Sequence, residues 1–155
     1  MADLTYSVDT LAYMNKLAEL AKLEVKVGYQ NGVQNNEGMS IAEYAYYNQF
    51  GTTHTPARPF MSDAFEKHTD EIQAFIAQQI SAVAAGGSPD QALQQIGAYT
   101  KGLIQEEIID GNFAPNAPST IRRKMKKGKN PKPLIDTGAM LQNVNFTVVS
   151  AEDDR

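Results

Sequence analysis

The sequence of 155 residues contains no cysteine, no tryptophan and only two histidines. The absence of cysteine excludes disulfides, thiol catalysis and thiolate metal sites, and it fits a protein made in a reducing cytosol. His54 and His68 form no HxxxH pair of the kind that holds a metal ion. The chain also lacks a GxSxG turn and the glycine loops that bind nucleotide phosphates. We therefore expect a protein that is not an enzyme and that binds no cofactor or metal.

Long hydrophobic runs are absent as well. Every apolar run is far shorter than the ~20 residues that a membrane helix needs, and the N-terminal stretch MADLTYSVDT has no basic region followed by an apolar one. We therefore expect no membrane partner. The net charge of −4 gives no general affinity for nucleic acid. The length fits one domain over residues 1–150, followed by a frayed tail at 151–155.

The spacing of apolar residues indicates where helices and strands lie. Spacings of three and four residues predict helices at 9–22, 40–50, 59–85, 89–110 and 120–127, with a further helical turn near 137. Strict alternation predicts half-buried strands at 23–30 and 143–150, neither of which is stable alone. We expect an α+β fold, in which a small antiparallel sheet packs against two long antiparallel helices, with shorter helices besides.

Capping residues predict several of these boundaries. Ser40 and Glu43 have the spacing of a capping box, in which each side chain binds the free backbone N–H of the other residue. Gly51 is placed to end that helix, and Pro59 is placed to be the first residue of the next one. Ser119 is predicted to cap the short helix at 120–127.

Half of the basic residues lie in one short segment, residues 121–132. This basic segment has no acidic residue and contains seven of the chain's fourteen basic ones: Arg122, Arg123, Lys124, Lys126, Lys127, Lys129 and Lys132. Because the net charge of the whole chain is −4, the rest of it carries −11. Such a block is either a mobile surface loop or an arm that contacts DNA phosphates or an acidic neighbour. The acidic remainder favours the neighbour, since copies that meet head to tail attract each other.

Arg58 lies between two prolines in the stretch TPARPF. Pro56 and Pro59 have a restricted φ and favour an extended backbone in the residue before them, so Arg58 is held extended, one residue before a helix. Two interpretations stay open. Arg58 binds groups of its own fold at that corner, or it is a pre-aimed anchor for a carboxylate on a neighbouring subunit.

Two segments resemble a family of phage structural proteins. The stretch AYYNQFGTTHTPARPFMSDAF, residues 45–65, resembles a segment of tail-completion and neck proteins of tailed phages, in which an aromatic-rich helix ends at FG and PARPF precedes a long helix. The stretch APNAPSTIRRKMKKGKNPKPLIDTGAMLQNVNFTVV, residues 114–149, resembles the second signature of that family, a short basic helix followed by PL, DTG and a strand. The two occur in the family's order. GAMLQNV departs from the more usual G-x-L-x-x-S-I arrangement, and the basic segment is unusually dense.

The resemblance implies a structural virion protein that joins head and tail. Such proteins form rings, typically hexamers, at the head-proximal end of the tail or in the neck, and they assemble in the host cytoplasm before they reside in the virion. The implied partners are further copies, tail-tube or tail-terminator proteins and head-connector proteins. The candidate contact residues are Arg58 and Phe60 of PARPF and the seven cations of the basic segment, which reach a neighbouring subunit or DNA in the lumen. The alternative expectation is a nucleic-acid-binding module that uses the basic segment.

Overall fold

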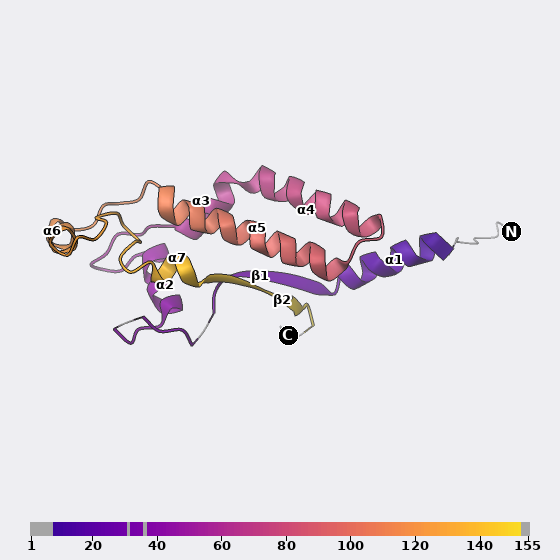
Figure 1. Cartoon of the computed structure of the whole chain (residues 1–155), viewed down its shortest axis with the longest axis horizontal. Helices are drawn as coiled ribbons and strands as arrows, with labels where there is room; N and C mark the ends of the chain where they lie inside the picture. Colours follow the sequence, from indigo (N-terminus) through magenta and orange to yellow (C-terminus); the bar gives the residue numbers. More distant parts are fainter. Residues whose placement is uncertain (1–7, 31, 36, 153–155) are drawn as a thin grey trace. The chain divides into compact units, whose positions relative to one another are not determined.

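A computed structural model of the chain describes residues 8–30, 32–35 and 37–152 (Figure 1). The helices are α1 (Val8–Leu20), α2 (Ile41–Phe50), α3 (Phe60–Lys67), α4 (Thr69–Ala84), α5 (Pro89–Asp110), α6 (Pro118–Lys126) and α7 (Ala139–Asn143). The strands are β1 (Leu23–Tyr29) and β2 (Val144–Ser150). Of the predicted tail, Ala151 and Glu152 form a turn, and residues 153–155 lie outside the described part.

The two strands pair with each other in a small antiparallel sheet. A hydrogen bond of 2.8 Å from the Ala151 N–H to the Lys22 carbonyl joins the residue after β2 to the residue before β1. From Leu23 to Val27, alternate side chains are half-buried and the two between them are exposed, which confirms the predicted period of two. Because the sheet packs against α5, the fold is α+β, as predicted.

The chain divides into two compact units, which are described separately. Of the described residues, unit 1 comprises 8–26, 70–100 and 146–152, and unit 2 comprises 27–30, 32–35, 37–69 and 101–145. In unit 1, α4 and the first part of α5 run antiparallel on either side of a tight turn (Figure 1). Phe75 of α4 stacks on Tyr99 of α5, with ring centroids 4.4 Å apart and planes inclined by 23°. This stacking confirms that the two helices pack together, as their apolar faces predict.

Unit 2 contains a cluster of buried hydrophobic residues. Phe60, at the start of α3, is fully buried and meets Tyr29 of β1 edge to face, with centroids 6.2 Å apart. Lys67 of α3 donates to the buried Glu107 of α5 at 2.5 Å, so a charge pair also joins these helices. The buried cluster draws on α2, α3, α5, the segment before α7, α7 and the first residue of β2: Ala45, Phe60, Ala64, Ile104, Ile108, Leu134, Met140 and Val144.

The prediction of one continuous helix at 59–85 is wrong. The structure has two helices there, because His68 leaves the helical conformation with φ −111° and ψ 18°. The Thr69 hydroxyl donates to the Phe65 carbonyl at 2.7 Å, and hydroxyl bonds of this kind compete with the backbone ladder of a helix. The apolar spacing continued across the break, and periodicity alone therefore missed it.

Three of the predicted caps are also wrong. Ser40 makes no side-chain capping bond, and the Glu43 side chain accepts a hydrogen bond of 2.7 Å from the Tyr47 hydroxyl. Pro59 occupies the N-cap position of α3 rather than its first helical residue. Ser119 lies inside α6, whose N-cap residue Ala117 has no side chain able to cap. By contrast, Gly51 ends α2 with φ +76°, a conformation that favours glycine.

Candidate functional site

Arg58 is buried in unit 2, with 5% of its surface exposed. Its Nε donates to the Ala114 carbonyl at 2.9 Å, and its Nη2 donates at 3.3 Å to the Pro115 carbonyl and to Oδ1 of Asn116. Its Nη1 donates to Oδ1 of Asn48 on α2, also at 3.3 Å. The guanidinium thus joins the end of α2 to residues 114–116, which lie more than fifty positions further along the chain. This geometry supports the interpretation that Arg58 secures a corner of its own fold.

Two amide side chains at the end of α2 complete this corner. Asn48 accepts from Arg58 with both its side-chain and its backbone oxygen, and its Nδ2 donates to the Tyr44 carbonyl at 2.9 Å. Gln49 accepts from the Met61 N–H at 3.0 Å and donates to the Ser62 hydroxyl at 2.6 Å, so it covers the start of α3. Sequence reasoning did not single out Gln49. The buried positions of α2 are 41, 45, 48 and 49, but Gln49 is polar, so the apolar spacing of the sequence carried no signal for it.

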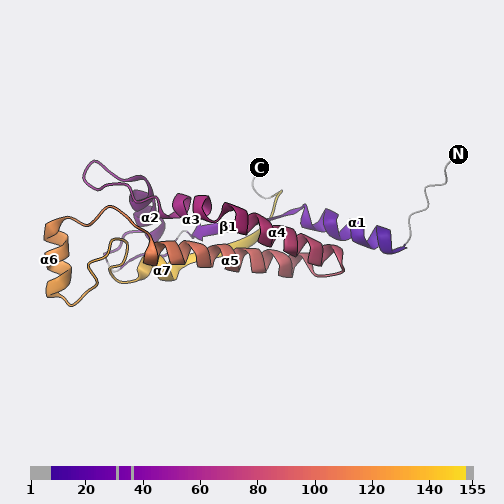
Figure 2. The same cartoon turned by 90° about the horizontal axis from the view of Figure 1, so that it is seen from above.

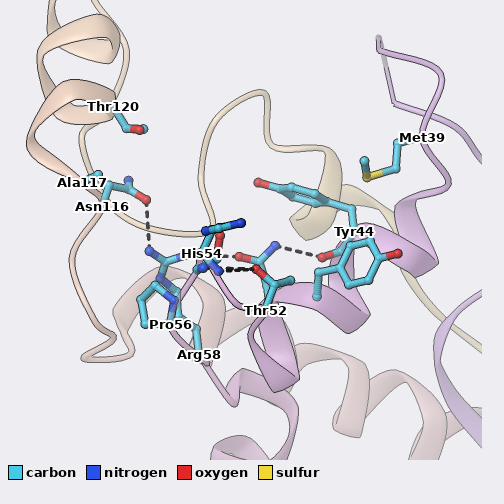
Figure 3. A pocket seen from close by; sticks show the side chains of 12 residues that line it. Met39, Tyr44, Thr52, His54, Pro56, Arg58, Asn116, Ala117 and Thr120 are labelled. Atoms are coloured by element: carbon cyan, nitrogen blue, oxygen red, sulfur yellow. Dashed lines mark hydrogen bonds between the residues drawn. The ribbon is translucent and has the colours of Figure 1, made fainter.

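A pocket of about 390 Å³ opens beside Arg58 (Figure 3). Side chains from α2, from the loop before α3 and from the start of α6 surround it. Its lining combines apolar surface with hydroxyl and amide groups and the Arg58 guanidinium, and no acidic residue is part of it: Met39, Tyr44, Tyr47, Asn48, Thr52, His54, Thr55, Pro56, Arg58, Asn116, Ala117 and Thr120. A pocket of this composition favours an anion or a hydrogen-bonding polar group.

The basic segment forms α6 and the residues that follow it. Figures 1 and 2 show α6 at the tip of two extended stretches, one from α5 and one leading to α7. Four of its cations line an open surface hollow of about 370 Å³, together with Ser119: Arg122, Arg123, Lys126 and Lys127. All four side chains are exposed, so they are available to an anionic partner.

The other three cations of the segment bind groups of their own chain. Lys124 is 6% exposed and donates to the carbonyls of Lys132 and Ile135 at 2.9 and 2.6 Å. Burial lowers the pKa of Lys124, although nearby Asp136 partly opposes this shift. Lys129 pairs with Asp136 at 3.2 Å, and Lys132 donates to the carbonyl of Ile109 at 3.0 Å. The sequence alone did not reveal this division within the segment.

The exposed aromatic side chains of α2 form a second surface feature of unit 2. Tyr46 and Phe50 have 60% and 65% of their surface exposed, and their ring centroids are 4.8 Å apart. They border a hollow of about 210 Å³ that Tyr29, Gln49 and Met61 also line. Exposed aromatic pairs of this kind are common where a protein binds another protein.

The predicted contact residues thus fall into three classes. Phe60 and Lys124 are buried in unit 2. Arg58 is buried as well, except where its side chain lines the pocket. The four exposed cations of the α6 hollow remain candidates for a partner contact. Lys129 and Lys132 follow α6 and bind groups of their own chain. His54 is exposed at the pocket, and His68 is half-buried at the end of α3.

Within residues 8–30, 32–35 and 37–152, no cluster of acidic and histidine side chains is arranged to hold a metal ion. No helix in that part of the chain is long and apolar enough to cross a membrane. Comparisons of the chain with protein-family models, with curated proteins and with solved structures found no match. What bears on function is therefore the resemblance of the two segments and the geometry of the corner and of α6.

Proposed function

We propose that the chain is a structural subunit of the tail-completion or neck ring of a tailed phage, where it joins the tail to the head connector. One observation carries the proposal. The two segments that resemble this family, residues 45–65 and 114–149, meet at Arg58, which binds the first three residues of the second segment. The two segments that resemble the family are therefore in contact with each other at one corner of unit 2.

Two surfaces of unit 2 support a role in assembly. The first segment exposes Tyr46 and Phe50, and the second exposes the four cations of the α6 hollow. Outside the basic segment the chain carries a net charge of −11. A cationic surface on one copy and an acidic surface on the next suit a head-to-tail contact, which closes into a ring when its rotation closes.

Native mass spectrometry of the purified chain and cryo-EM of phage particles test this proposal. We expect a closed ring, typically a hexamer, and density for the chain at the head–tail junction. Lys126→Glu, in the α6 hollow, is expected to weaken assembly, whereas Lys22→Glu, at another exposed lysine, is expected to leave it intact. A wild-type chain that is strictly monomeric and absent from particles refutes the proposal.

The second candidate function is nucleic-acid binding by the α6 hollow, which the clustering of four exposed cations favours. It predicts that the logarithm of the binding constant falls linearly with the logarithm of the salt concentration. The slope should become shallower by about 0.9 for each phosphate contact removed. Lys126→Gln and Lys127→Gln together remove up to two phosphate contacts. The double variant is therefore expected to have a slope shallower by up to about 1.8. A chain that binds no DNA at low salt would eliminate this candidate.

A further inference from the structure

The charge of Arg58 is balanced by neutral groups alone within the described residues. Its four partners are two backbone carbonyls and two amide oxygens, and no carboxylate pairs with it in the part of the chain described. Three of these four hydrogen bonds are 3.3 Å long, beyond the usual 2.9–3.0 Å. A guanidinium has five N–H donors, so at least one Nη1 donor is left over. Buried charges are ordinarily paired with an opposite charge, and Arg58 is an exception.

The surroundings of Arg58 add to this imbalance. Burial lowers the pKa of Arg58, although Tyr44 partly opposes this shift. The pKa of Lys124 is lowered mainly by its burial, and the charge of Arg58 nearby contributes to that shift. The N-terminus of α6 borders the same pocket, and Ala117 leaves the backbone N–H groups of its first turn without a side-chain cap. Those N–H groups carry a partial positive charge. The pocket therefore combines a buried cation, a positive helix end and a lining without acidic residues.

We propose that this pocket binds a carboxylate group, presented by an aspartate or glutamate side chain of a second copy of the chain. The planar guanidinium of Arg58 matches a carboxylate, and Thr52 and Thr120 also belong to the lining of the pocket (Figure 3). The acidic remainder of the chain supplies the complementary charge. The choice of a second copy as the source rests on the proposed ring.

A titration of the purified full-length chain tests the carboxylate site directly. The probe is N-acetyl-glutamate amide, which carries one side-chain carboxylate, and the NMR signal of the Arg58 Nε–H is the readout. We expect a saturable shift at millimolar probe, and none with N-acetyl-glutamine amide at the same ionic strength. The absence of a shift with glutamate, or an equal shift with glutamine, overturns the proposal. Inorganic phosphate that binds at least roughly tenfold more tightly than the glutamate probe points to a phosphate ligand and overturns it as well.

Ala117 offers a matched pair of variants that does not disturb the corner. Ala117 is exposed, lies at the N-cap of α6 and lines the pocket. Ala117→Asp and Ala117→Asn introduce caps of similar strength, but only aspartate places a carboxylate at the pocket. We expect Ala117→Asp to bind the glutamate probe at least roughly tenfold more weakly than Ala117→Asn, because the new carboxylate competes for the site. Equal affinities for the two variants contradict the proposal.

Measuring ring assembly together with the titration distinguishes a failure of the carboxylate site from a failure of the proposed function. We expect Ala117→Asp to assemble into rings less completely than Ala117→Asn in native mass spectrometry. If the wild-type chain forms rings but the titration fails, the carboxylate site is refuted and the ring stands. If the titration saturates but the wild-type chain stays monomeric, the second copy is refuted as the source, together with the proposed function.

Discussion

Replacement of Arg58 by alanine is expected to destabilise the chain strongly. It removes hydrogen bonds to Asn48, Ala114, Pro115 and Asn116 at once. A hydrogen bond to a charged group contributes about 1.5–3 kcal/mol, but three of these bonds are long and the pocket admits water to some of the freed oxygens. We therefore expect a loss of about 3–4 kcal/mol in the free energy of unfolding. For a chain of this size the loss corresponds to a melting temperature lower by roughly 6–16 °C.

Urea denaturation followed by far-UV circular dichroism measures this change. Arg58→Lys keeps the charge but supplies donors from a single point, so it is expected to recover at most about half of the loss. Arg122→Ala is the control, because Arg122 is an exposed arginine of α6 and is expected to change stability by less than about 0.5 kcal/mol. A loss below about 1 kcal/mol for Arg58→Ala would falsify the conclusion that these hydrogen bonds hold the corner. If Arg58→Lys were as stable as the wild type, the planar arrangement of the guanidinium donors would not matter for the corner.

Further predictions concern α5 and β1. Gly97→Ala is expected to destabilise the chain by about 1–3 kcal/mol, because the new Cβ would lie 2.2 Å from the Phe146 ring. Gly102→Ala, at a helical position with nothing within 4 Å, is expected to stabilise it by about 0.5–1 kcal/mol, and thermal shifts of the same sign for the two variants would contradict this packing. Tyr29→Phe is expected to raise stability by about 1 kcal/mol, because the buried Tyr29 hydroxyl has no hydrogen-bond partner in the described structure. Burial also raises the pKa of Tyr29 well above its usual value, so the unfolded chain loses this proton first and stability falls above about pH 10. The advantage of Tyr29→Phe in urea denaturation should therefore grow from pH 8 to 10.5, and an advantage independent of pH would count against this effect.

Much of the secondary structure could be predicted because its causes are local. The alternating pattern of β1 and the spacing of α5 reflect which side of a strand or helix is buried, and that periodicity is written along the chain. Gly51 also marked the end of α2, because capping involves residues within one turn of the boundary. The break at His68 escaped prediction because apolar spacing carries no information on competing hydroxyl bonds.

In the candidate site, too, features with a local cause could be predicted and features that depend on distant segments could not. The two prolines predict an extended backbone at Arg58, since their effect is local. Its partners at residues 114–116 could not be predicted, because which carbonyl oxygens face a guanidinium depends on how distant segments fold together.

The basic segment shows the same contrast. Its sequence determined that seven cations lie close together and that the rest of the chain is acidic. Only the tertiary structure decided that Lys124 is buried against two carbonyls while Lys126, two residues away, is exposed. The two positions point to different sides of one helix, and the side that is buried is set by what the helix packs against. Charge along the chain is a property of the sequence, whereas the accessibility of each charge to a partner is a property of the fold.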